Sequence, residues 1–510
     1  MDFFVKRVKY VLRIILLIAI AFQIVLFGNI EVICGCVVSF LSLEAFNYTV
    51  FKSNIIGNHP VTFLAITGLE CFTYFAPIFT LIDGNPITYK MENPNSTFMW
   101  QLIYICVTLI AFRISIKFTS KYPFIRNCLY RIGYFQPVSN KTLWFMGLCG
   151  LVAKVYLLTN QYGDDVTQGA GTVSIFLPFL MAPYCTMFRE LFDSNYKYKE
   201  SNNKTFIILY TVVLLGMAIA SNSRNSIVTI IMGFFLMYFM KLLLHDTSQL
   251  KRFVCITKKK FITILIIFFV VTGPISDFAM AMVVVRSARS DLSAFQLMKE
   301  TVDLVMDRES MDRIKTTMNK IENISNTDWD ETYVANLFAA RLCNYLVADK
   351  TIYYAEKGDI PNKQLMEYSI MRIKTIFPQP IVNFLFGHID KSEINYSPMD
   401  CLLASRIGHN RQSYFVGGDV GLGIATFGYA FPIFQLFMYI LLFSFLDQYV
   451  IRKNDIVIIP VITLISLYGF FYTFMAGNGI LFRFISLFWA VPFGILLKVL
   501  LLKFTSKIFG

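Results

Sequence analysis

Long runs of apolar residues, separated by short polar segments, extend along most of the chain. Several runs reach the roughly 20 residues that an α-helix needs to cross the hydrocarbon core of a membrane. Because the runs are continuous and do not alternate with polar residues, they predict helices and not the strands of a membrane β-barrel. Breaking the runs at charges and at glycine, proline and asparagine clusters predicts twelve spans, at about residues 9–28, 30–50, 60–82, 97–117, 142–159, 173–191, 205–222, 226–244, 261–285, 421–446, 455–475 and 479–501.

One hydrophilic segment interrupts this pattern, from about residue 286 to residue 420. Loops of more than about 15 residues are usually functional or disordered, so the segment is too long for a simple connection. Its apolar residues recur at intervals of three and four, which is typical of amphipathic helices. They include Leu292, Phe295, Leu297, Met298, Val302 and Val305, and further along Val334, Leu337, Phe338 and Leu342. We therefore expect an all-α polytopic membrane protein, with spans one to nine in 1–285, a helical cap in 286–420, and spans ten to twelve with a short tail in 421–510.

The composition excludes a soluble protein, since 56% of the residues are hydrophobic and only 15% are charged. Lys and Arg outnumber Asp and Glu by 46 to 33, which in a soluble domain would suggest nucleic acid binding. Here the cations gather in the short loops on one side of the predicted spans, and such loops face the cytoplasm. They include Lys6, Arg7, Lys9, Arg13, Lys117, Lys121, Arg126, Arg131, Lys141, Lys197, Lys199, Lys204, Lys251, Arg252, Lys258, Lys259, Lys260, Arg452, Lys453, Lys503 and Lys507. The pattern predicts cytoplasmic termini, an outward-facing segment 286–420, and a lipid bilayer as partner in place of nucleic acid.

The cysteines indicate no metal site. Cys34 and Cys36 form a C-x-C pair without the second pair that a zinc site needs. Cys343 and Cys401 are the two cysteines in the outward-facing segment, where an oxidising compartment would permit a disulfide. Whether they are bonded stays open at this stage, because a sequence cannot show their distance.

Arginine concentrates where the outward-facing segment meets the membrane. Arg286 and Arg289 follow one predicted span directly, while Arg406, His409 and Arg411 lie shortly before the next. Guanidinium groups bind phosphate bidentately and keep their charge, so these ends are suited to a phosphate at headgroup depth. His409 is suited to proton transfer or pyrophosphate binding. The alternative is that the arginines satisfy lipid headgroups and acidic neighbours, and that His409 is structural.

Other ionisable residues lie inside or at the ends of predicted spans. Arg224 occupies a polar turn, Ser221 to Ser226, between two spans, where it either binds an anion or extends to the headgroups. Charges buried in a membrane must face the protein interior or a water-filled cavity. Lys154 and Arg483 lie toward the outer ends of their spans, at the level of Arg224. The acidic residues Glu70 and Asp277 are expected to pair with a cation.

These features together resemble the bacterial O-antigen polymerase family (Wzy, oligosaccharide repeat-unit polymerases), which is related to the O-antigen ligases. The resemblance covers roughly residues 205–480 and includes the many-spanned layout with one large late outer segment. It also lies in Ser223-Arg224 at the start of a span. The stretch from Gly408-His409-Asn410 to Gly421-Leu422-Gly423 and Phe427-Gly428 is similar to a ligase-type motif. An R-x10-G pattern of such polymerases is met by Arg406 and Gly417 but not from Arg411, where Leu422 replaces the glycine.

The resemblance implies a GT-C-type fold in the bacterial inner membrane and an enzyme without a cofactor. Such an enzyme transfers a glycan from undecaprenyl pyrophosphate to another lipid-linked repeat unit on the periplasmic face, building surface polysaccharide of the lipopolysaccharide type, with a chain-length regulator as a further partner. It implies catalytic roles for His409 and Arg406 and pyrophosphate binding by Arg224, Arg286, Arg289, Arg411 and Arg483, supported by Lys154, Glu70, Asp277 and Gly417. The alternatives are an O-antigen ligase and a flippase or transporter, although the two related halves typical of transporters are not found.

Overall fold

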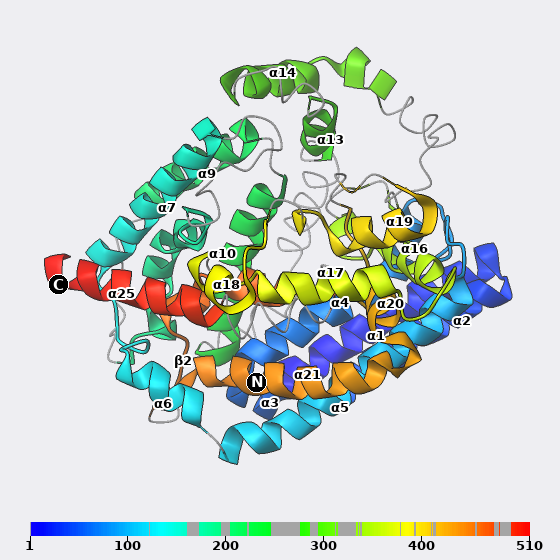
Figure 1. Ribbon diagram of the computed structural model, residues 1–510, viewed down its shortest axis with the longest axis horizontal. Helices are drawn as coiled ribbons and strands as arrows, with labels where there is room; N and C mark the ends of the chain where they lie inside the picture. Colours follow the sequence, from blue (N-terminus) through cyan, green and yellow to red (C-terminus); the bar gives the residue numbers. More distant parts are fainter. Residues whose placement is uncertain are drawn as a thin grey trace.

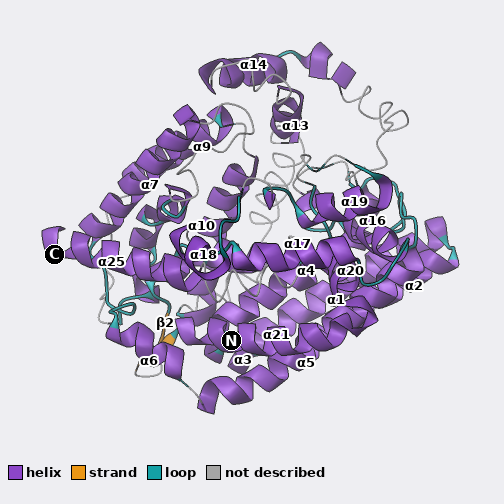
Figure 2. Ribbon diagram, viewed as in Figure 1, coloured by secondary structure: helices purple, strands orange, loops and turns teal. Residues whose placement is uncertain are grey.

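The computed structural model describes residues 2–121, 123–160, 173–194, 204–221, 224–245, 276–285, 294–311, 313–314, 333–334, 336, 339–377, 379–391, 394–409, 411, 415–453, 456–473, 479 and 491–509. Within these ranges the regular secondary structure is helical except for one antiparallel hairpin, β1 (Ile451–Lys453) and β2 (Ile456–Ile458), as Figure 2 shows. The expected all-α class is therefore confirmed for the described part of the chain.

Seven segments are long and apolar enough to cross a membrane, and the chain is a membrane-embedded protein. Six of them belong to α1 (Asp2–Phe27), α2 (Ile30–Thr49), α4 (Pro60–Ile82), α5 (Pro94–Lys121), α7 (Asn140–Asn160) and α10 (Arg224–Leu244). The seventh, Asp419–Tyr449, is divided into α20 (Asp419–Phe427), η8 (Gly428–Ala430), α21 (Phe431–Leu446) and η9 (Asp447–Tyr449). These segments confirm seven of the twelve predicted spans.

The remaining predicted spans differ from single long helices. Residues 173–191 form the short 3₁₀ helices η1 (Leu177–Met181), η2 (Pro183–Met187) and η3 (Arg189–Leu191), the first two with a proline in the first turn, which cannot extend an α-helical hydrogen-bond ladder. The span at 205–222 is α9 (Lys204–Ala220), an apolar helix of 17 residues. The span at 455–475 is wrong as one helix, because it contains β2, α22 (Val461–Leu464) and α23 (Leu467–Thr473). Most of 261–285 and 479–501 lies outside the described residues, and their ends form α13 (Ser276–Val285) and α25 (Val491–Phe509).

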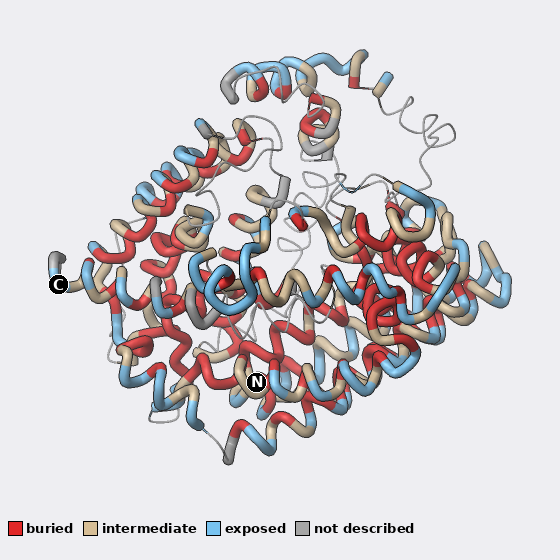
Figure 3. The backbone as a smooth tube through the Cα atoms, in the orientation of Figure 1, coloured by how far each residue is buried: buried red, intermediate tan, exposed pale blue. Residues whose placement is uncertain are grey.

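The membrane helices form two groups, which Figure 1 shows side by side. In one group α1, α2 and α4 pack together, α2 packs on α5, and α5 packs on α21. In the other, α7 packs on η1, η2, α9 and α25. The broken helix α23 joins the groups, because it contacts both α4 and α10. Buried positions line the facing sides of the helices, and exposed positions line their outer sides (Figure 3).

The hydrophilic segment contributes several short helices. They are α14 (Ala294–Met306), η6 (Ala339–Arg341), α16 (Tyr345–Glu356), α17 (Lys363–Lys374), α18 (Gln379–Phe386) and α19 (Pro398–Ile407). Two further short helices, α3 (Ser53–Asn58) and α6 (Phe124–Arg131), lie among the membrane helices. The helix α14 packs on α13 and α9, and α16 is embedded between α20 and α5. Periodicity predicted a helix around Val334 to Leu342, where the described residues form only the single turn η6.

A close backbone crossing seats α16 on α20. A Cβ atom added at Gly421 would lie 2.5 Å from the carbonyl carbon of Thr351, and one at Gly418 would lie 2.9 Å from the Cα atom of Ala348. Only glycine permits so close an approach. The Gly418 amide also donates to the Thr351 hydroxyl at 2.8 Å. Gly421, the first residue of the predicted tenth span, therefore packs directly against a helix of the hydrophilic segment.

Cys343 and Cys401 are both buried and both free, so they form no disulfide with each other. Burial raises the pKa of the Cys401 thiol to about 11, which leaves it protonated and unreactive at neutral pH.

Candidate functional site

Arg406, a predicted catalytic residue, lies in the last turn of α19 and faces the end of α16. Its guanidinium donates to the backbone carbonyls of Tyr354 at 3.1 Å, Ala355 at 3.3 Å and Asp359 at 2.7 Å. The last carbonyl groups of a helix have no partner within it, and a cation there is favoured by the helix dipole. Arg406 therefore caps α16 and fixes the loop that follows it.

His409 and Arg411, which follow α19 in the sequence, contact aromatic rings. The imidazole of His409 packs against Phe415, with ring centroids 5.2 Å apart, and the guanidinium carbon of Arg411 lies 5.3 Å from the ring centroid of Tyr396. Asp400 holds this loop, because its carboxylate accepts from the Phe415 amide at 3.1 Å while completing the capping box of α19. His409 is half-buried and Arg411 is exposed.

The predicted cations do not all meet at one point. Arg406 binds carbonyl groups at the end of α16, whereas Arg411 rests on Tyr396, which precedes α19, so the two guanidinium groups have different partners. Arg224 begins α10, but its side chain lies outside the described residues, as do Arg286, Arg289 and Arg483.

Lys154 does lie at the predicted level. Its ammonium group donates to the Ser226 hydroxyl in the first turn of α10 at 3.3 Å, two residues after Arg224. The two spans therefore bring Lys154 and the start of α10 to the same depth.

Among the described residues, Glu70 does not show the expected pairing with a cation. Its Oε2 atom accepts from the Ser42 hydroxyl at 2.6 Å, and its Oε1 atom has no hydrogen-bond partner among the described residues although the side chain is buried. Asp277 is half-buried in the first turn of α13. Gly417 is buried, and a Cβ atom there would lie 2.9 Å from the Leu422 side chain, which gives this glycine a packing role.

Two carboxylates on one face of α16, seven residues apart, were not predicted from the sequence. Asp349 is fully buried and accepts from the amides of Glu92 at 2.6 Å and Asn93 at 3.1 Å and from the Thr97 hydroxyl at 2.8 Å. It thereby caps the start of α5. Burial raises the pKa of Asp349, although these hydrogen bonds favour its charged form.

The second carboxylate, Glu356, is half-buried and lies beside an aromatic pair. It accepts from the Trp100 indole nitrogen at 3.3 Å, from the Ser96 hydroxyl at 3.3 and 3.4 Å, and from the side-chain amide of Asn93 at 3.5 Å. The Trp100 ring stacks on Tyr429 with centroids 6.1 Å apart and planes within 9°. Trp100 is one of four tryptophans in the chain, but nothing local in the sequence connects it to Glu356.

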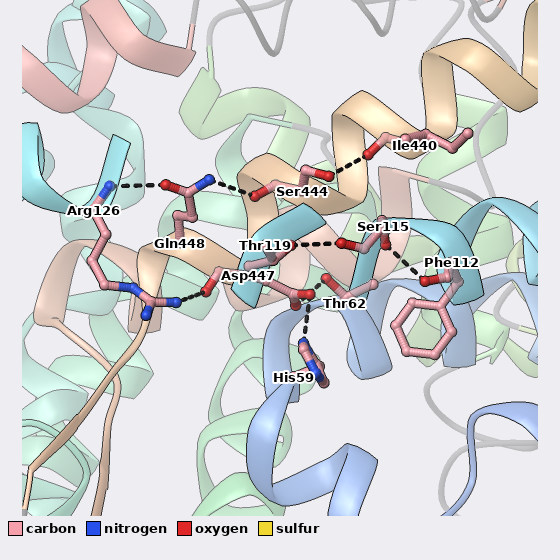
Figure 4. Close-up of polar contacts among 10 residues, drawn as sticks. All are labelled: His59, Thr62, Phe112, Ser115, Thr119, Arg126, Ile440, Ser444, Asp447 and Gln448. Carbon is pink, nitrogen blue, oxygen red and sulfur yellow. Dashed lines mark hydrogen bonds and ion pairs between the residues drawn. The ribbon is translucent and has the colours of Figure 1, made fainter. Parts of the chain in front are cut away.

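A third polar cluster lies at the opposite end of α21 (Figure 4). The Asp447 carboxylate lies 2.6 Å from His59 Nδ1 and accepts from the Thr62 hydroxyl at 2.6 Å, and its carbonyl accepts from Arg126 at 3.1 Å. Both carboxylate oxygens of Asp447 have partners, and the side chain is almost fully buried. This cluster clamps α4, α6 and α21 together and leaves no open position for a substrate at Asp447.

Among the described residues, the ends of α5, α16 and α21 that are opposite the clamp bring Glu356, Trp100 and Tyr429 together. The end of α16 carries Glu356, Arg406 holds that end, and the loop after α19 carries His409. In comparisons with known proteins, no family model, no curated protein and no solved structure matches the chain.

Proposed function

We propose that the protein is a glycosyltransferase that polymerises undecaprenyl-pyrophosphate-linked oligosaccharide repeat units on the periplasmic face of the bacterial inner membrane. The observation that supports this most directly is the site at the end of α16. There a half-buried carboxylate and a stacked indole–phenol pair lie beside α19, which carries Arg406 and is followed in the sequence by His409. Aromatic faces pack against the C–H faces of sugars, and guanidinium groups bind phosphates.

The chemistry requires two services from the protein. The departing diphosphate needs positive charge, and the attacking hydroxyl must lose a proton. Arg411 is exposed, so its guanidinium is accessible to a lipid pyrophosphate. His409 contacts the pyrophosphate or transfers the proton, and Arg406 positions the end of α16. Further phosphate contacts come from the arginines that the sequence pattern indicates, Arg224, Arg286, Arg289 and Arg483.

An O-antigen ligase would use the same chemistry with a different acceptor. A flippase for the same lipid-linked glycan is a second candidate, and the interrupted helices at 177–191 and 461–473 favour it, because discontinuous membrane helices often form transport sites. In a deletion strain, loss of the polymerase leaves single repeats on the lipid, loss of the ligase leaves polymer on undecaprenyl pyrophosphate, and loss of the flippase leaves repeats inside.

The direct test incubates the purified protein in lipid nanodiscs with a lipid-linked repeat unit and a chelator. A ladder of products on a gel supports the polymerase. Movement of labelled lipid between leaflets without a ladder supports the flippase and refutes the polymerase.

Three variants locate the site in the same assay. Arg411→Lys keeps the charge but loses the planar fork, so we expect a severe loss of product. His409→Ala should lower the rate by about 10² to 10⁴. Arg308 is exposed and lies two residues after the end of α14. Arg308→Ala is therefore the control and should leave the ladder unchanged.

The orientation has its own test. Reporters that are active only in the periplasm should be active when fused near Asn326 and silent when fused near Thr247. The reverse result would place the site on the cytoplasmic side and contradict the proposal.

A further inference from the structure

The two carboxylates of α16 are held very differently. Asp349 is fully buried, and its three hydrogen bonds measure 2.6, 2.8 and 3.1 Å. Glu356 is half-buried, and its contacts measure 3.3 to 3.5 Å. Good hydrogen bonds from N–H and O–H donors to oxygen are shorter, at about 2.5 to 3.2 Å. Asp349 is therefore a structural cap, whereas Glu356 is loosely held.

Glu356 also has no cationic partner among the described residues. No nitrogen of Lys, Arg or His within the described ranges lies within 4.0 Å of the Glu356 oxygens. The ion pairs found in those ranges all involve other carboxylates. The neighbouring Lys357 instead lies over the rings of Tyr353 and Tyr354, at 5.3 and 5.8 Å. A carboxylate without a countercharge retains its capacity to accept a proton from a ligand.

An exposed aromatic surface accompanies this carboxylate. Tyr429 is 64% exposed and stacks on Trp100, whose indole nitrogen donates to Glu356. Tyrosine and tryptophan also occur at membrane interfaces without a ligand. At such a belt the rings contact lipid headgroups, and no carboxylate is required. Here the Trp100 indole connects the aromatic pair to the Glu356 carboxylate. A site for a sugar ring needs both an aromatic face for the ring and an acceptor for its hydroxyl groups.

Several contacts fix the backbone at the end of α16, which carries Glu356, relative to this surface. Arg406 binds the carbonyls of Tyr354, Ala355 and Asp359, which flank Glu356 in the sequence. The loop beyond approaches Gly428, the residue before Tyr429, where an added Cβ atom would lie 3.7 Å from Ile360. The carboxylate and the aromatic pair are therefore parts of one assembly.

We propose that Trp100 and Tyr429 form the subsite for a sugar ring of the acceptor glycan and that Glu356 removes the proton from its attacking hydroxyl. This inference rests on the proposed function. The acceptor oxygen forms a bond to the anomeric carbon of the donor, and the bond from that carbon to the pyrophosphate oxygen breaks. The proton passes from the hydroxyl to Glu356, and the electron pair leaves with the lipid pyrophosphate. His409 then serves as a pyrophosphate contact.

The experiment measures steady-state kinetics of full-length protein in nanodiscs with lipid-linked donor and acceptor. Glu356→Gln keeps an acceptor for the indole but accepts no proton, so kcat should fall by about 10² to 10⁴ without a rise in KM. Trp100→Ala and Tyr429→Ala should raise the KM for the acceptor, by up to roughly tenfold. Glu367, exposed on α17, provides the control, and Glu367→Gln should leave both constants unchanged.

Chemical rescue separates proton transfer from a structural role. In Glu356→Ala, added formate should restore part of kcat, because a small carboxylate can occupy the vacated space, and formate should not affect the wild-type protein. Wild-type kcat in Glu356→Gln, or a loss in Glu356→Ala that formate does not relieve, would overturn the assignment of the base. Unchanged KM in both aromatic variants would overturn the subsite. If the wild-type protein gives no ladder, the proposed function itself fails.

Discussion

Replacing Asp349 by alanine should release α16 from the start of α5. The change removes the acceptor for the amides of Glu92 and Asn93 and for the hydroxyl of Thr97, of which the last is fully buried. A buried donor left without a partner costs about 1 to 3 kcal/mol. The two backbone amides belong to residues that are exposed or half-buried, so water can replace part of their hydrogen bonds. The loss of each of these two hydrogen bonds therefore costs about 0.5 kcal/mol. With a loss of about 0.5 to 1 kcal/mol of helix-dipole stabilisation, the total is about 2.5 to 5 kcal/mol.

The thiol of Cys343 reports this release directly. It is fully buried just before the start of α16, whereas Cys128 in the short helix α6 is exposed and provides an internal reference for the reagent. Maleimide labelling of the Cys343 peptide, followed by mass spectrometry, measures how often the region opens. A destabilisation of about 2.5 to 5 kcal/mol corresponds to roughly 70- to 5,000-fold faster labelling when opening is in rapid equilibrium.

A control and an internal check accompany this experiment. Asp303→Ala, on the exposed side of α14, should not change the labelling rate of Cys343. Thr97→Val should give a smaller increase, and in the Asp349→Ala background it should add little, because the bond is already lost. Labelling in Asp349→Ala within threefold of the wild-type rate would show that this carboxylate does not hold α16 to α5.

Three further predictions concern stability. Gly421→Ala should lower the unfolding temperature, because overpacking at the close crossing costs about 1 to 3 kcal/mol. The control is Gly216→Ala in α9, where no atom lies within 4 Å of the added Cβ and the unfolding temperature should not fall. Equal behaviour of the two variants would refute the close crossing. Ser42→Ala removes the hydrogen-bond partner of buried Glu70 and should cost about 1 to 3 kcal/mol in thermal unfolding, and an unchanged transition would contradict the assigned bond. Burial lowers the pKa of His245 below its ordinary value, so the stability contributed by its neutral form is fully present above that ordinary pKa and is lost as pH falls below it. His245→Gln should flatten this dependence of stability on pH, and an identical slope in both proteins would exclude His245 as its source.

The long membrane helices could be predicted because one local property decides them. A run of about 20 apolar residues must satisfy its backbone within itself when lipid surrounds it, and a helix does so without distant partners. The segment at 455–475 is equally apolar, but its N-terminal part pairs with β1 and its C-terminal part packs between α4 and α10. Apolar runs of strand and helix cannot be distinguished by hydropathy alone when both are buried.

The residue types of the candidate site could also be predicted, but their partners could not. The sequence indicates Arg406 because a guanidinium near a membrane surface is suited to phosphate. In the structure the same group binds backbone carbonyls that lie 47 to 52 positions earlier in the chain. A carbonyl carries no sequence signal, so a capping arginine and a phosphate-binding arginine have the same local pattern.

The helix α16 shows most clearly what a local pattern omits. Its sequence contains Asp349, Lys350 and Glu356, which indicates a solvated helix, yet nearly every residue of it is buried. Burial is possible because the start of α5, more than 250 positions earlier, supplies the donors for its carboxylates. Glu356 comes from the predicted cap, while Trp100 and Tyr429 come from membrane helices or their ends. The predicted boundary between cap and membrane region therefore passes through the site, and neither part alone can assemble it.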